Sequence, residues 1–507
     1  MKAKVLMVQG TASHVGKSIL VAALCRIFRQ DGIRVAPFKA QNMSLNSFVT
    51  PDGGEIGRAQ AVQAEAAGIP PSVEMNPILL KTEADNRSQV VVMGKPLRSA
   101  SATEYYQLKT ILWPKVMAAL DKLRSEYELV VIEGAGGPAE VNLKRDEIVN
   151  MRVARYARAP VLLVGDIERG GVFASLLGTL ELLEPAERKL VKALVINKFR
   201  GDLSILEPGL KFLEERTGLP VAGVVPYFHD IHVAEEDAVA LDGKRPYNTK
   251  STSGGLDIAV LRLPHLSNFD DFDPLEKEKD VVLRYVSAAD EMGHPDLIII
   301  PGTKTTMADL DWLEQRGLAR SLREEHRKGT PIVGICGGYQ MLGERILDPG
   351  AVESSDPVRE GLGLLPVTTT FSASKETHQV KGKVDSGRGL LLLAGGLPVE
   401  GYEIHMGATR GAHGRKPFAI RERSGRTCKR ADGCLDSSGQ VLGTYIHGLF
   451  HNEELRRAIL KQIAGSKGRH LEPGPDFSRE AEYDKLAELI RRSLNMELIY
   501  EIAGLRR

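Results

Sequence analysis

The segment from Val5 to Ser18 constrains the possible folds more than any other part of the chain. It reads V-L-M-V-Q-G-T-A-S-H-V-G-K-S, a short apolar run followed by a loop that opens at Gly10 and closes at Gly16. The residues after it are rich in Leu, Ala and Val, which is typical of a helix. A strand, a glycine loop and a helix in this order predict a phosphate-binding loop, because the loop N–H groups and the helix N-terminus attract anions.

The polar residues of this loop indicate ATP and Mg²⁺ as ligands. We expect Gly10, Thr11 and Gly16 to shape the loop around the phosphates. In such loops a lysine, here Lys17, reaches the transferred phosphate, and a hydroxyl, here Ser18, holds Mg²⁺. Five residues separate Gly10 from Gly16 where the common phosphate loop has four, so the spacing favours a subclass with a longer loop. A glycine turn with an unrelated lysine is the alternative.

Two further strand ends in the first half of the chain carry polar side chains. Leu129 to Pro138 reads L-V-V-I-E-G-A-G-G-P and places Glu133 at the carboxyl end of a buried strand, where open parallel sheets bind ligands. A carboxylate there suits Mg²⁺, and a solvent-facing glutamate is the alternative. Asn197 ends another apolar run, and its amide offers the donor and acceptor needed to read a purine.

Two polar segments are candidates for contact with a substrate. The segment K-A-Q-N-M-S-L-N is rich in amides and hydroxyls, and we expect Gln41 and Asn42 to contact the substrate. The segment V-N-L-K-R-D-E-I-V-N-M offers Asn142, Lys144 and Asp146 to a molecule that carries both carboxylates and amides. Solvated surface loops are the alternative for both segments.

A second strand-to-helix unit lies in the other half of the chain. Pro331 to Leu342 reads P-I-V-G-I-C-G-G-Y-Q-M-L, which predicts a sharp turn that projects Cys336 into a cleft. The helix N-terminus favours the thiolate, and the Gly337 N–H can stabilise an oxyanion. Gly302 follows another apolar run, and we expect its backbone to supply the second oxyanion donor.

A cysteine nucleophile needs a base, and two histidines are candidates. His447 follows an apolar run in Y-I-H-G-L-F, far downstream of Cys336, as is usual for Cys/His pairs. His405 lies in G-Y-E-I-H-M-G, whose flanks look more like a strand that lines an acceptor pocket, so it ranks second. The alternative is a buried structural cysteine with an unrelated histidine.

Apolar runs without polar alternation predict buried parallel strands in both halves of the chain. These runs are 5–8, 129–132, 161–164, 194–196 and 221–225, then 258–263, 297–300, 332–335 and 441–445. Because they alternate with helical patterns, the predicted fold class is α/β, with two domains in a chain of 507 residues. The polar stretch 238–255 predicts a linker, so the expected divisions are a phosphate-loop domain over 1–237, a second domain over 256–465 and a helical tail over 466–507.

Composition limits the partners and the location of the protein. The chain has 67 Lys and Arg against 66 Asp and Glu, a net charge of +1, so nothing attracts it to nucleic acid or to an anionic membrane. No apolar run approaches the ~20 residues that span a bilayer, and Met1 leads into a strand without a signal-peptide pattern. We therefore expect a cytoplasmic protein whose partners are small molecules.

Together these motifs resemble those of the cobyric acid synthase family, the glutamine-dependent amidoligases of cobalamin biosynthesis. The resemblance rests on G-T-A-S-H-V-G-K-S with E-G-A-G-G-P, then on G-I-C-G-G-Y-Q-M-L-G and Y-I-H-G-L-F, and it spans nearly the whole chain. The segments K-A-Q-N-M-S-L-N, N-L-K-R-D-E-I-V-N-M and Y-E-I-H-M-G look like this family rather than its a,c-diamide-forming relatives. The resemblance implies a dethiobiotin-synthetase-like phosphate-loop domain and a class I glutamine amidotransferase domain with a flavodoxin-like fold.

The resemblance also implies a reaction. Glutamine is hydrolysed at Cys336 with His447, and ammonia passes to the first domain, where ATP activates the b, d, e and g carboxylates of adenosylcobyrinic acid a,c-diamide. Class I glutaminases commonly orient the histidine with a glutamate two residues on, but here that residue is Leu449, so a Cys/His dyad is expected and the orienting group stays open. The alternatives are an a,c-diamide synthase-like amidoligase, a partitioning-type regulatory ATPase, and a hydrolase that acts on its own substrate.

Overall fold

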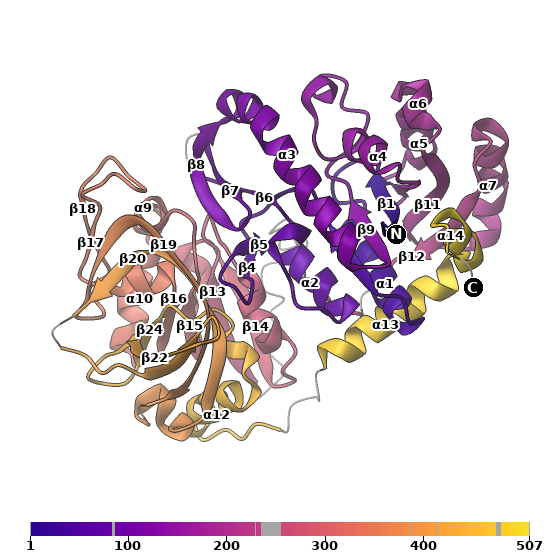
Figure 1. Ribbon diagram of the computed structural model, residues 1–507. Helices are drawn as coiled ribbons and strands as arrows, with labels where there is room; N and C mark the ends of the chain where they lie inside the picture. The colour runs from indigo at the N-terminus through magenta and orange to yellow at the C-terminus, as the bar shows by residue number, and fades with distance from the viewer. Residues whose placement is uncertain are drawn as a thin grey trace.

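The computed structural model places two α/β units side by side, the first half of the chain in one and most of the second half in the other (Figure 1). It describes residues 2–83, 87–228, 230–234, 255–385, 387–411, 413–472 and 478–505. The predicted linker 238–255 lies outside these residues except at its last position. Within the described ranges, no helix has the length and apolar character needed to cross a membrane.

The first unit is built on a parallel six-stranded sheet in the order β12-β11-β10-β1-β9-β2. Its strands are β1 (Lys4–Gly10), β2 (Val35–Phe38), β9 (Leu129–Glu133), β10 (Val161–Asp166), β11 (Val191–Phe199) and β12 (Val221–Pro226). The five predicted strands are confirmed, and β2 was not predicted. Along β1, Val5 and Met7 pack into one hydrophobic core and Leu6 and Val8 into another, so both faces of the sheet are covered.

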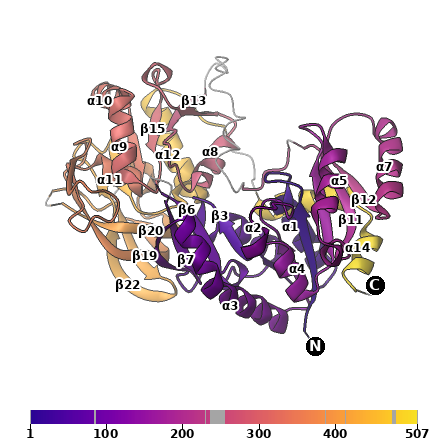
Figure 2. The same cartoon turned by 90° about the horizontal axis from the view of Figure 1, so that it is seen from above.

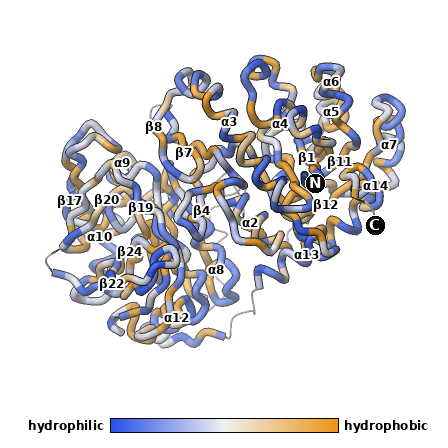
Figure 3. The backbone as a smooth tube through the Cα atoms, viewed as in Figure 1, coloured by the Kyte–Doolittle hydropathy of each residue, from blue (hydrophilic) through white to orange (hydrophobic). Residues whose placement is uncertain are grey.

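Helices surround this sheet. They are α1 (Lys17–Gln30), α2 (Arg58–Ala67), α3 (Ala102–Glu126), α4 (Met151–Ala157), α5 (Val172–Leu182), α6 (Pro185–Arg188) and α7 (Leu203–Thr217). In Figure 3 the strands around β1 and β11 are among the hydrophobic segments of the chain, as expected for a sheet buried on both faces.

Two small sheets of the first unit face the second unit. One contains β3 (Gln41–Met43), β6 (Ile78–Thr82), β7 (Arg87–Val92) and β8 (Lys95–Ser101), and the other contains β4 (Ser47–Val49) and β5 (Glu55–Gly57). Figures 1 and 2 both place β6 and β7 beside the strands of the second unit. The segment predicted as a substrate loop is therefore partly a strand, because residues 41–43 pair with residues 78–80. Three residues are too few for a periodic signal in the sequence.

The second unit contains a six-stranded sheet in the order β14-β13-β15-β16-β24-β23. Its strands are β13 (Leu256–Leu261), β14 (Val281–Val286), β15 (Leu297–Ile300), β16 (Ile332–Ile335), β23 (Cys434–Leu435) and β24 (Val441–Thr444). All described pairs are parallel except β23 with β24. The four predicted strands of this half are confirmed, and with them the α/β class of both units.

A second, mostly antiparallel layer covers the second unit. It contains β17 (Arg345–Leu347), β18 (Val358–Glu360), β19 (Thr368–Val384), β20 (Pro398–Arg410), β21 (Phe418–Arg423) and β22 (Arg426–Asp432). The helices of this unit are α8 (Asp273–Glu276), α9 (Thr306–Gln315), α10 (Leu318–Arg327), α11 (Gly337–Leu342) and α12 (Glu453–Ser466). The long strand β19 pairs with β20 over most of its length.

The end of the chain returns to the first unit. It forms α13 (Arg479–Ser493) and α14 (Met496–Ile502), shown in yellow beside α1 and β12 in Figure 1. Leu486 and Ile499 are buried in the same hydrophobic core as α1, and Arg26 of α1 pairs with Asp484 at 2.7 Å. The helical character expected for this tail is thus present in the described residues, and the limits of the domains stay predictions.

Candidate active site at the domain boundary

Cys336 lies at the sharp turn between β16 and α11. Its backbone has φ 52° and ψ −108°, a left-handed φ that is rare for a residue with a side chain and is typical of strained functional turns. The two glycines after it are required by close packing. A Cβ on Gly338 would lie 2.0 Å from the Ile300 carbonyl oxygen, and one on Gly337 would lie 3.1 Å from the Thr303 nitrogen. The structure therefore shows the predicted strand-to-helix turn.

His447 lies next to Cys336 and is fully buried. Its Nδ1 is 2.7 Å from Oδ2 of Asp271, and the other oxygen of Asp271 accepts the Gly448 N–H at 2.7 Å. The side chain of His447 also interacts with the Cys336 thiol, and both residues line the same cleft. The three side chains form a Cys-His-Asp arrangement in which each orients the next.

The electrostatics of the site favour a charged imidazole. Burial opposes the charge, but the carboxylate of Asp271 and the thiol of Cys336 outweigh it and raise the pKa of His447 to about 10. A protonated His447 can stabilise a thiolate and can later donate its proton to a leaving amine.

Asp271 was missed in the sequence, where the orienting group stayed open and a dyad was expected. It lies in the short helix η4 (Phe269–Phe272), far from His447 in the chain. The signal that could have found it is F-D-D-F, two adjacent acids among apolar residues shortly after a buried strand. Leu449 is fully buried in the core and orients nothing.

His405 has the surroundings of a neutral structural histidine. It is on β20, its ring stacks on Tyr445 with centroids 3.7 Å apart, and its Nδ1 donates to the Gly407 carbonyl at 2.7 Å. Burial lowers its pKa to about 4. Its hydrogen-bond partner is a neutral carbonyl rather than a carboxylate, so His405 is less suited than His447 to take up a proton, and its second rank as a base stays a prediction.

The cleft in front of Cys336 is lined by both units. Lys81 and Gln89 come from β6 and β7 of the first unit, whereas Lys304 and Glu353 come from the second. Burial raises the pKa of Glu353 to about 7, although nearby Lys304 opposes this shift. Gly302 borders the same space, since a Cβ on it would lie 2.9 Å from Cε1 of the catalytic imidazole. A molecule at Cys336 therefore touches a surface shared by the two units.

The glycine loop of the first unit has the geometry of a phosphate cradle. Gly16 has φ 96°, and a Cβ on Gly10 would lie 2.3 Å from the side chain of Val15. Lys17 Nζ donates to the Ala12 carbonyl at 2.8 Å, across the loop. Thr11 joins the loop to the sheet through a bond from its N–H to the carbonyl of Val164 at 2.9 Å.

Glu133 lies at the base of this loop and does not face solvent. It is 1% exposed, and its Oε1 accepts the Ser18 hydroxyl at 2.7 Å and pairs with Lys39 Nζ at 2.9 Å. Its Oε2 accepts Gln63 Nε2 at 2.6 Å. The alternative of a solvent-facing glutamate is therefore wrong, because Glu133 is buried and its carboxylate is compensated by three polar partners.

The side chain of Asn197 also contacts the phosphate loop. Its Nδ2 donates to the Val15 carbonyl at 2.8 Å, and its Oδ1 accepts the N–H of Lys198 at 2.9 Å. Both polar groups of this amide therefore support the cradle in the present structure. A contact with a purine stays a prediction.

The predicted substrate residues fall in two places. Gln41 accepts the Tyr105 hydroxyl of α3, and Asn42 donates to Gln60 Oε1 of α2 at 2.9 Å. Asn142 and Asp146 are exposed, on the segment after β9. Asp146 interacts electrostatically with Lys109, which is also on α3, so this helix lies near both places. Lys144 instead pairs with Glu187 at 2.8 Å.

The two units match two known domain families. Residues 6–240 match the CobQ/CobB/MinD/ParA nucleotide binding domain, and residues 257–455 match the CobB/CobQ-like glutamine amidotransferase domain. With its cysteine site and its phosphate loop, the chain is a glutamine amidotransferase joined to a nucleotide-binding domain.

Full-length relatives specify the family further. The chain is 55% identical to a cobyric acid synthase of Dehalococcoides mccartyi, over 99% of both chains. It is 52% identical to that of Moorella thermoacetica, over 100% of this chain and 98% of the relative, and 52% identical to that of Sorangium cellulosum, over 100% of both. The chain belongs to the cobyric acid synthase family.

Proposed function

We propose that the protein uses ATP and glutamine to convert the b, d, e and g carboxylates of adenosylcobyrinic acid a,c-diamide into amides. One observation carries the proposal. In a chain 55% identical to a cobyric acid synthase, Cys336 and His447 line a cleft to which the nucleotide-binding domain contributes Lys81 and Gln89, and Asp271 binds His447 from behind them. This arrangement suits a reaction in which one domain releases ammonia and the other consumes it.

The cysteine site would release ammonia from glutamine. The Cys336 thiolate attacks the amide carbon, and the N–H groups of Gly337 and Gly302 are the proposed donors to the oxyanion. His447 gives its proton to the leaving nitrogen, which departs as ammonia and leaves a thioester. His447 then takes a proton from water, which attacks the thioester and yields glutamate and the free thiolate.

The phosphate loop would activate the acceptor carboxylate. A carboxylate is a poor electrophile, and transfer of the terminal phosphoryl group of ATP makes an acyl phosphate that ammonia attacks, releasing phosphate. Lys17 is placed to stabilise the transferring group, and Gly10, Thr11, Gly16 and Asn197 shape the loop around the nucleotide.

The residues at the base of the loop fit Mg²⁺. Ser18 and Glu133 are hard oxygen ligands 2.7 Å apart, and they would hold the ion, which would offset negative charge on the phosphates. Among the described residues no cluster of three His, Cys, Asp or Glu side chains could hold a metal, so further ligands would come from ATP and water.

Gln41, Asn42, Asn142 and Asp146 are the proposed contacts of the corrinoid. Amides suit a substrate that carries both carboxylates and finished amides. Asp146 is tolerated because Lys109 lies near it and balances its charge.

A specific observation weighs against two of the three alternatives. A partitioning-type ATPase would not require the Cys336, His447 and Asp271 arrangement. A hydrolase acting alone would not require that the nucleotide-binding domain line the cleft at Cys336. The a,c-diamide synthase-like amidoligase differs only in which carboxylates it amidates, and counting the amides formed discriminates it.

The test compares nitrogen donors in the wild type and in Cys336→Ala. The corrinoid is incubated with ATP and Mg²⁺ and with either glutamine or an ammonium salt, and amides are counted by mass spectrometry. We expect four amides from the wild type with either donor, and from Cys336→Ala only with ammonium, because only the source of ammonia is lost. Lys17→Ala should show the opposite pattern: it should form no amide with either donor but should still hydrolyse glutamine. Equal loss with both donors in Cys336→Ala would contradict separate sites.

A further inference from the structure

The loop that carries Asp271 is held by the nucleotide-binding domain. This orienting loop, residues 266–272, connects β13 to α8 and contains Asn268, which has a left-handed φ of 55°. The Asn268 N–H donates to Asn46 Oδ1 at 2.7 Å, and the Ser47 N–H donates to Asn268 Oδ1 at 2.9 Å. This reciprocal pair crosses the domain boundary and fixes both the backbone and the side chain of Asn268, whose Nδ2 is 3.5 Å from Nε2 of His447.

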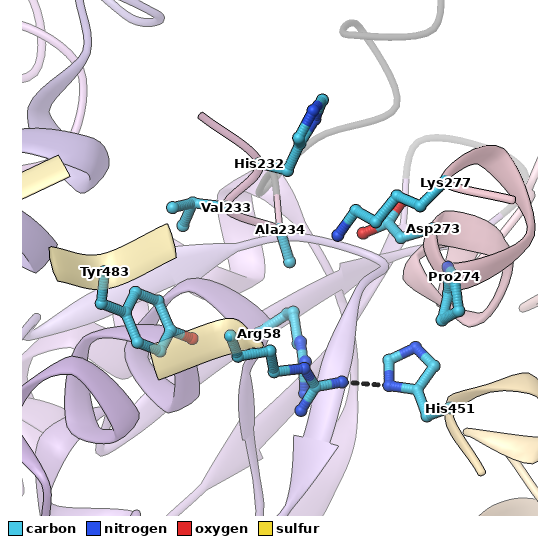
Figure 4. Close-up of a pocket in the computed structure, with 10 residues that line it drawn as sticks. Arg58, His232, Val233, Ala234, Asp273, Pro274, Lys277, His451 and Tyr483 are labelled. Carbon is cyan, nitrogen blue, oxygen red and sulfur yellow. Dashed lines mark hydrogen bonds between the residues drawn. The ribbon is translucent and has the colours of Figure 1, made fainter. Parts of the chain in front are cut away.

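Arg58 makes a second link to the same loop. Its side chain, at the start of α2, is 3% exposed, and its Nε is 3.1 Å from Asp270 Oδ2. Figure 4 shows Arg58 between Tyr483 and His451 in a pocket at the domain boundary. His451 Nε2 donates to the backbone carbonyl of Asp270 at 2.7 Å, which holds the loop from the other side. The residue directly before Asp271 is thus held by both domains.

The elements that hold the orienting loop also touch the nucleotide site. Helix α2 carries Gln63, which donates to Glu133 Oε2 at 2.6 Å and to the Ser18 carbonyl at 3.3 Å. It also carries Gln60, the partner of Asn42. A movement of α2 in response to a bound nucleotide would therefore move Arg58 as well.

We propose that Asn46 and Arg58 are positioning residues for His447, so that the glutaminase site has its active geometry only when the nucleotide-binding domain holds the orienting loop. This inference rests on the proposed function, because it assumes glutamine hydrolysis at Cys336. The physical reason is that Asp271 can orient the imidazole only while the loop keeps it within hydrogen-bond distance. Arg58 in addition neutralises Asp270, which would otherwise place an uncompensated negative charge directly beside Asp271.

The test uses the full-length protein with Asn46→Ala, Arg58→Met and Arg58→Lys. The matched control is Thr377→Val, which removes another interdomain bond, from Thr377 Oγ1 to the Gly53 carbonyl at 2.7 Å. Three quantities are measured: kcat and KM for glutamate release, the ammonium-driven rate of amide formation, and the pH dependence of Cys336 alkylation by iodoacetamide, followed on the Cys336 peptide by mass spectrometry.

We expect Asn46→Ala and Arg58→Met to lower kcat for glutamate release by about 10- to 100-fold, with KM and the ammonium-driven rate unchanged. Alkylation of Cys336 at neutral pH should slow in both variants, because a displaced imidazolium stabilises less thiolate. Arg58→Lys should recover part of the loss, and Thr377→Val should match the wild type. The ammonium-driven rate shows that each variant has folded.

Two results would overturn the inference: wild-type kcat and alkylation in both Asn46→Ala and Arg58→Met, or equal loss of the glutamine-driven and ammonium-driven rates. The first result would show that the orienting loop keeps its position without Asn46 and Arg58. The second would show that these two residues stabilise the whole protein rather than the glutaminase site. Absence of glutamate release from the wild type would be a different failure, because it would overturn the proposed function and this inference with it.

Discussion

At the level of single residues, the imidazole of His447 is held on two sides. Asp271 binds its Nδ1, and the ring of Tyr402 stacks on it with centroids 5.1 Å apart and an angle of 16° between the planes. The ring can neither flip nor rotate without breaking one of these contacts. These two contacts therefore fix the position and the orientation of the ring.

The first prediction concerns the carboxylate of Asp271. We expect Asp271→Asn to lower kcat for glutamine hydrolysis by about 10²–10⁴-fold, because an amide does not stabilise the imidazolium and can favour the wrong tautomer. The measurement is glutamate release over a range of pH, with ammonium-driven amide formation as the control that stays unchanged.

The sign of the pH effect follows from the raised pKa of His447. In the wild type its proton is lost only as the pH rises through about 10, so glutaminase activity should decline only there. In Asp271→Asn burial remains and the main opposing charge is gone, so the decline should move toward pH 6.5 or lower. The raised pKa also stabilises the fold, fully below about pH 6.5 and no longer above about 10. An unchanged pH profile would show that Asp271 does not set the charge of His447.

At the level of elements, the position of Cys336 depends on how closely α11 approaches β15. The approach is possible because Gly338 has no side chain, and a Cβ there would overlap the Ile300 carbonyl oxygen at 2.0 Å. The backbones of Gly338 and Ile300 both belong to buried elements, so neither can shift without moving the helix or the strand.

The second prediction is therefore Gly338→Ala. We expect a loss of about 1–3 kcal/mol in the free energy of unfolding, because the strand and the helix must separate, and a larger loss of glutaminase than of ammonium-driven amide formation. Thermal unfolding and the two rate assays measure this. The control is Gly465→Ala on α12, where no atom lies within 4 Å of the added Cβ. The control should be neutral or gain up to about 1 kcal/mol. Equal stability of the two variants would contradict the close-packing argument.

At the level of the whole molecule, a buried charge cluster joins the two domains. Glu55 of the first domain is fully buried and pairs with Lys81 at 2.9 Å and with Lys375 of the second domain at 2.5 Å. Burial alone would raise the pKa of Glu55, but the two ammonium groups outweigh it and hold the pKa below its ordinary value. Burial lowers the pKa of Lys375 to about 8 in spite of the carboxylate. While the domains are docked, the buried carboxylate and the two buried ammonium groups therefore depend on one another for compensation.

The third prediction is that Glu55→Gln separates the two reactions. The substitution leaves Lys81 and Lys375 buried without a carboxylate, which costs about 3–5 kcal/mol and favours opening of the boundary. We expect a lower melting temperature and more glutamate released than amide formed, because ammonia escapes to water. The control is Glu324→Gln, which removes an exposed pair with Arg320 and should change neither quantity. One amide for each glutamate in Glu55→Gln would show that the cluster does not keep the domains coupled.

Local patterns in the sequence determined much of the fold. The nine predicted strands formed because each is an apolar run that must be buried. The two glycine turns formed because Gly16 adopts a left-handed φ and Gly338 leaves room for the Ile300 carbonyl. The same patterns located Cys336 and Glu133 at the carboxyl ends of strands and Lys17 at the start of the helix after the glycine loop. The small sheets were missed because β3, β4 and β5 have only three residues each and β8 is mostly polar, so none of them gives an apolar run.

What only the tertiary structure decided is which distant residues meet. Asp271 orients His447, Asn46 holds Asn268, and Asn197 supports the phosphate loop, and in each pair the two residues lie far apart in the chain. Periodicity reports which face of an element is buried but not which element packs against it. The sequence by itself therefore determined the two α/β units and the candidate nucleophile, whereas the tertiary fold of the second unit placed Asp271 beside His447 and the docking of the units placed Asn46 beside Asn268.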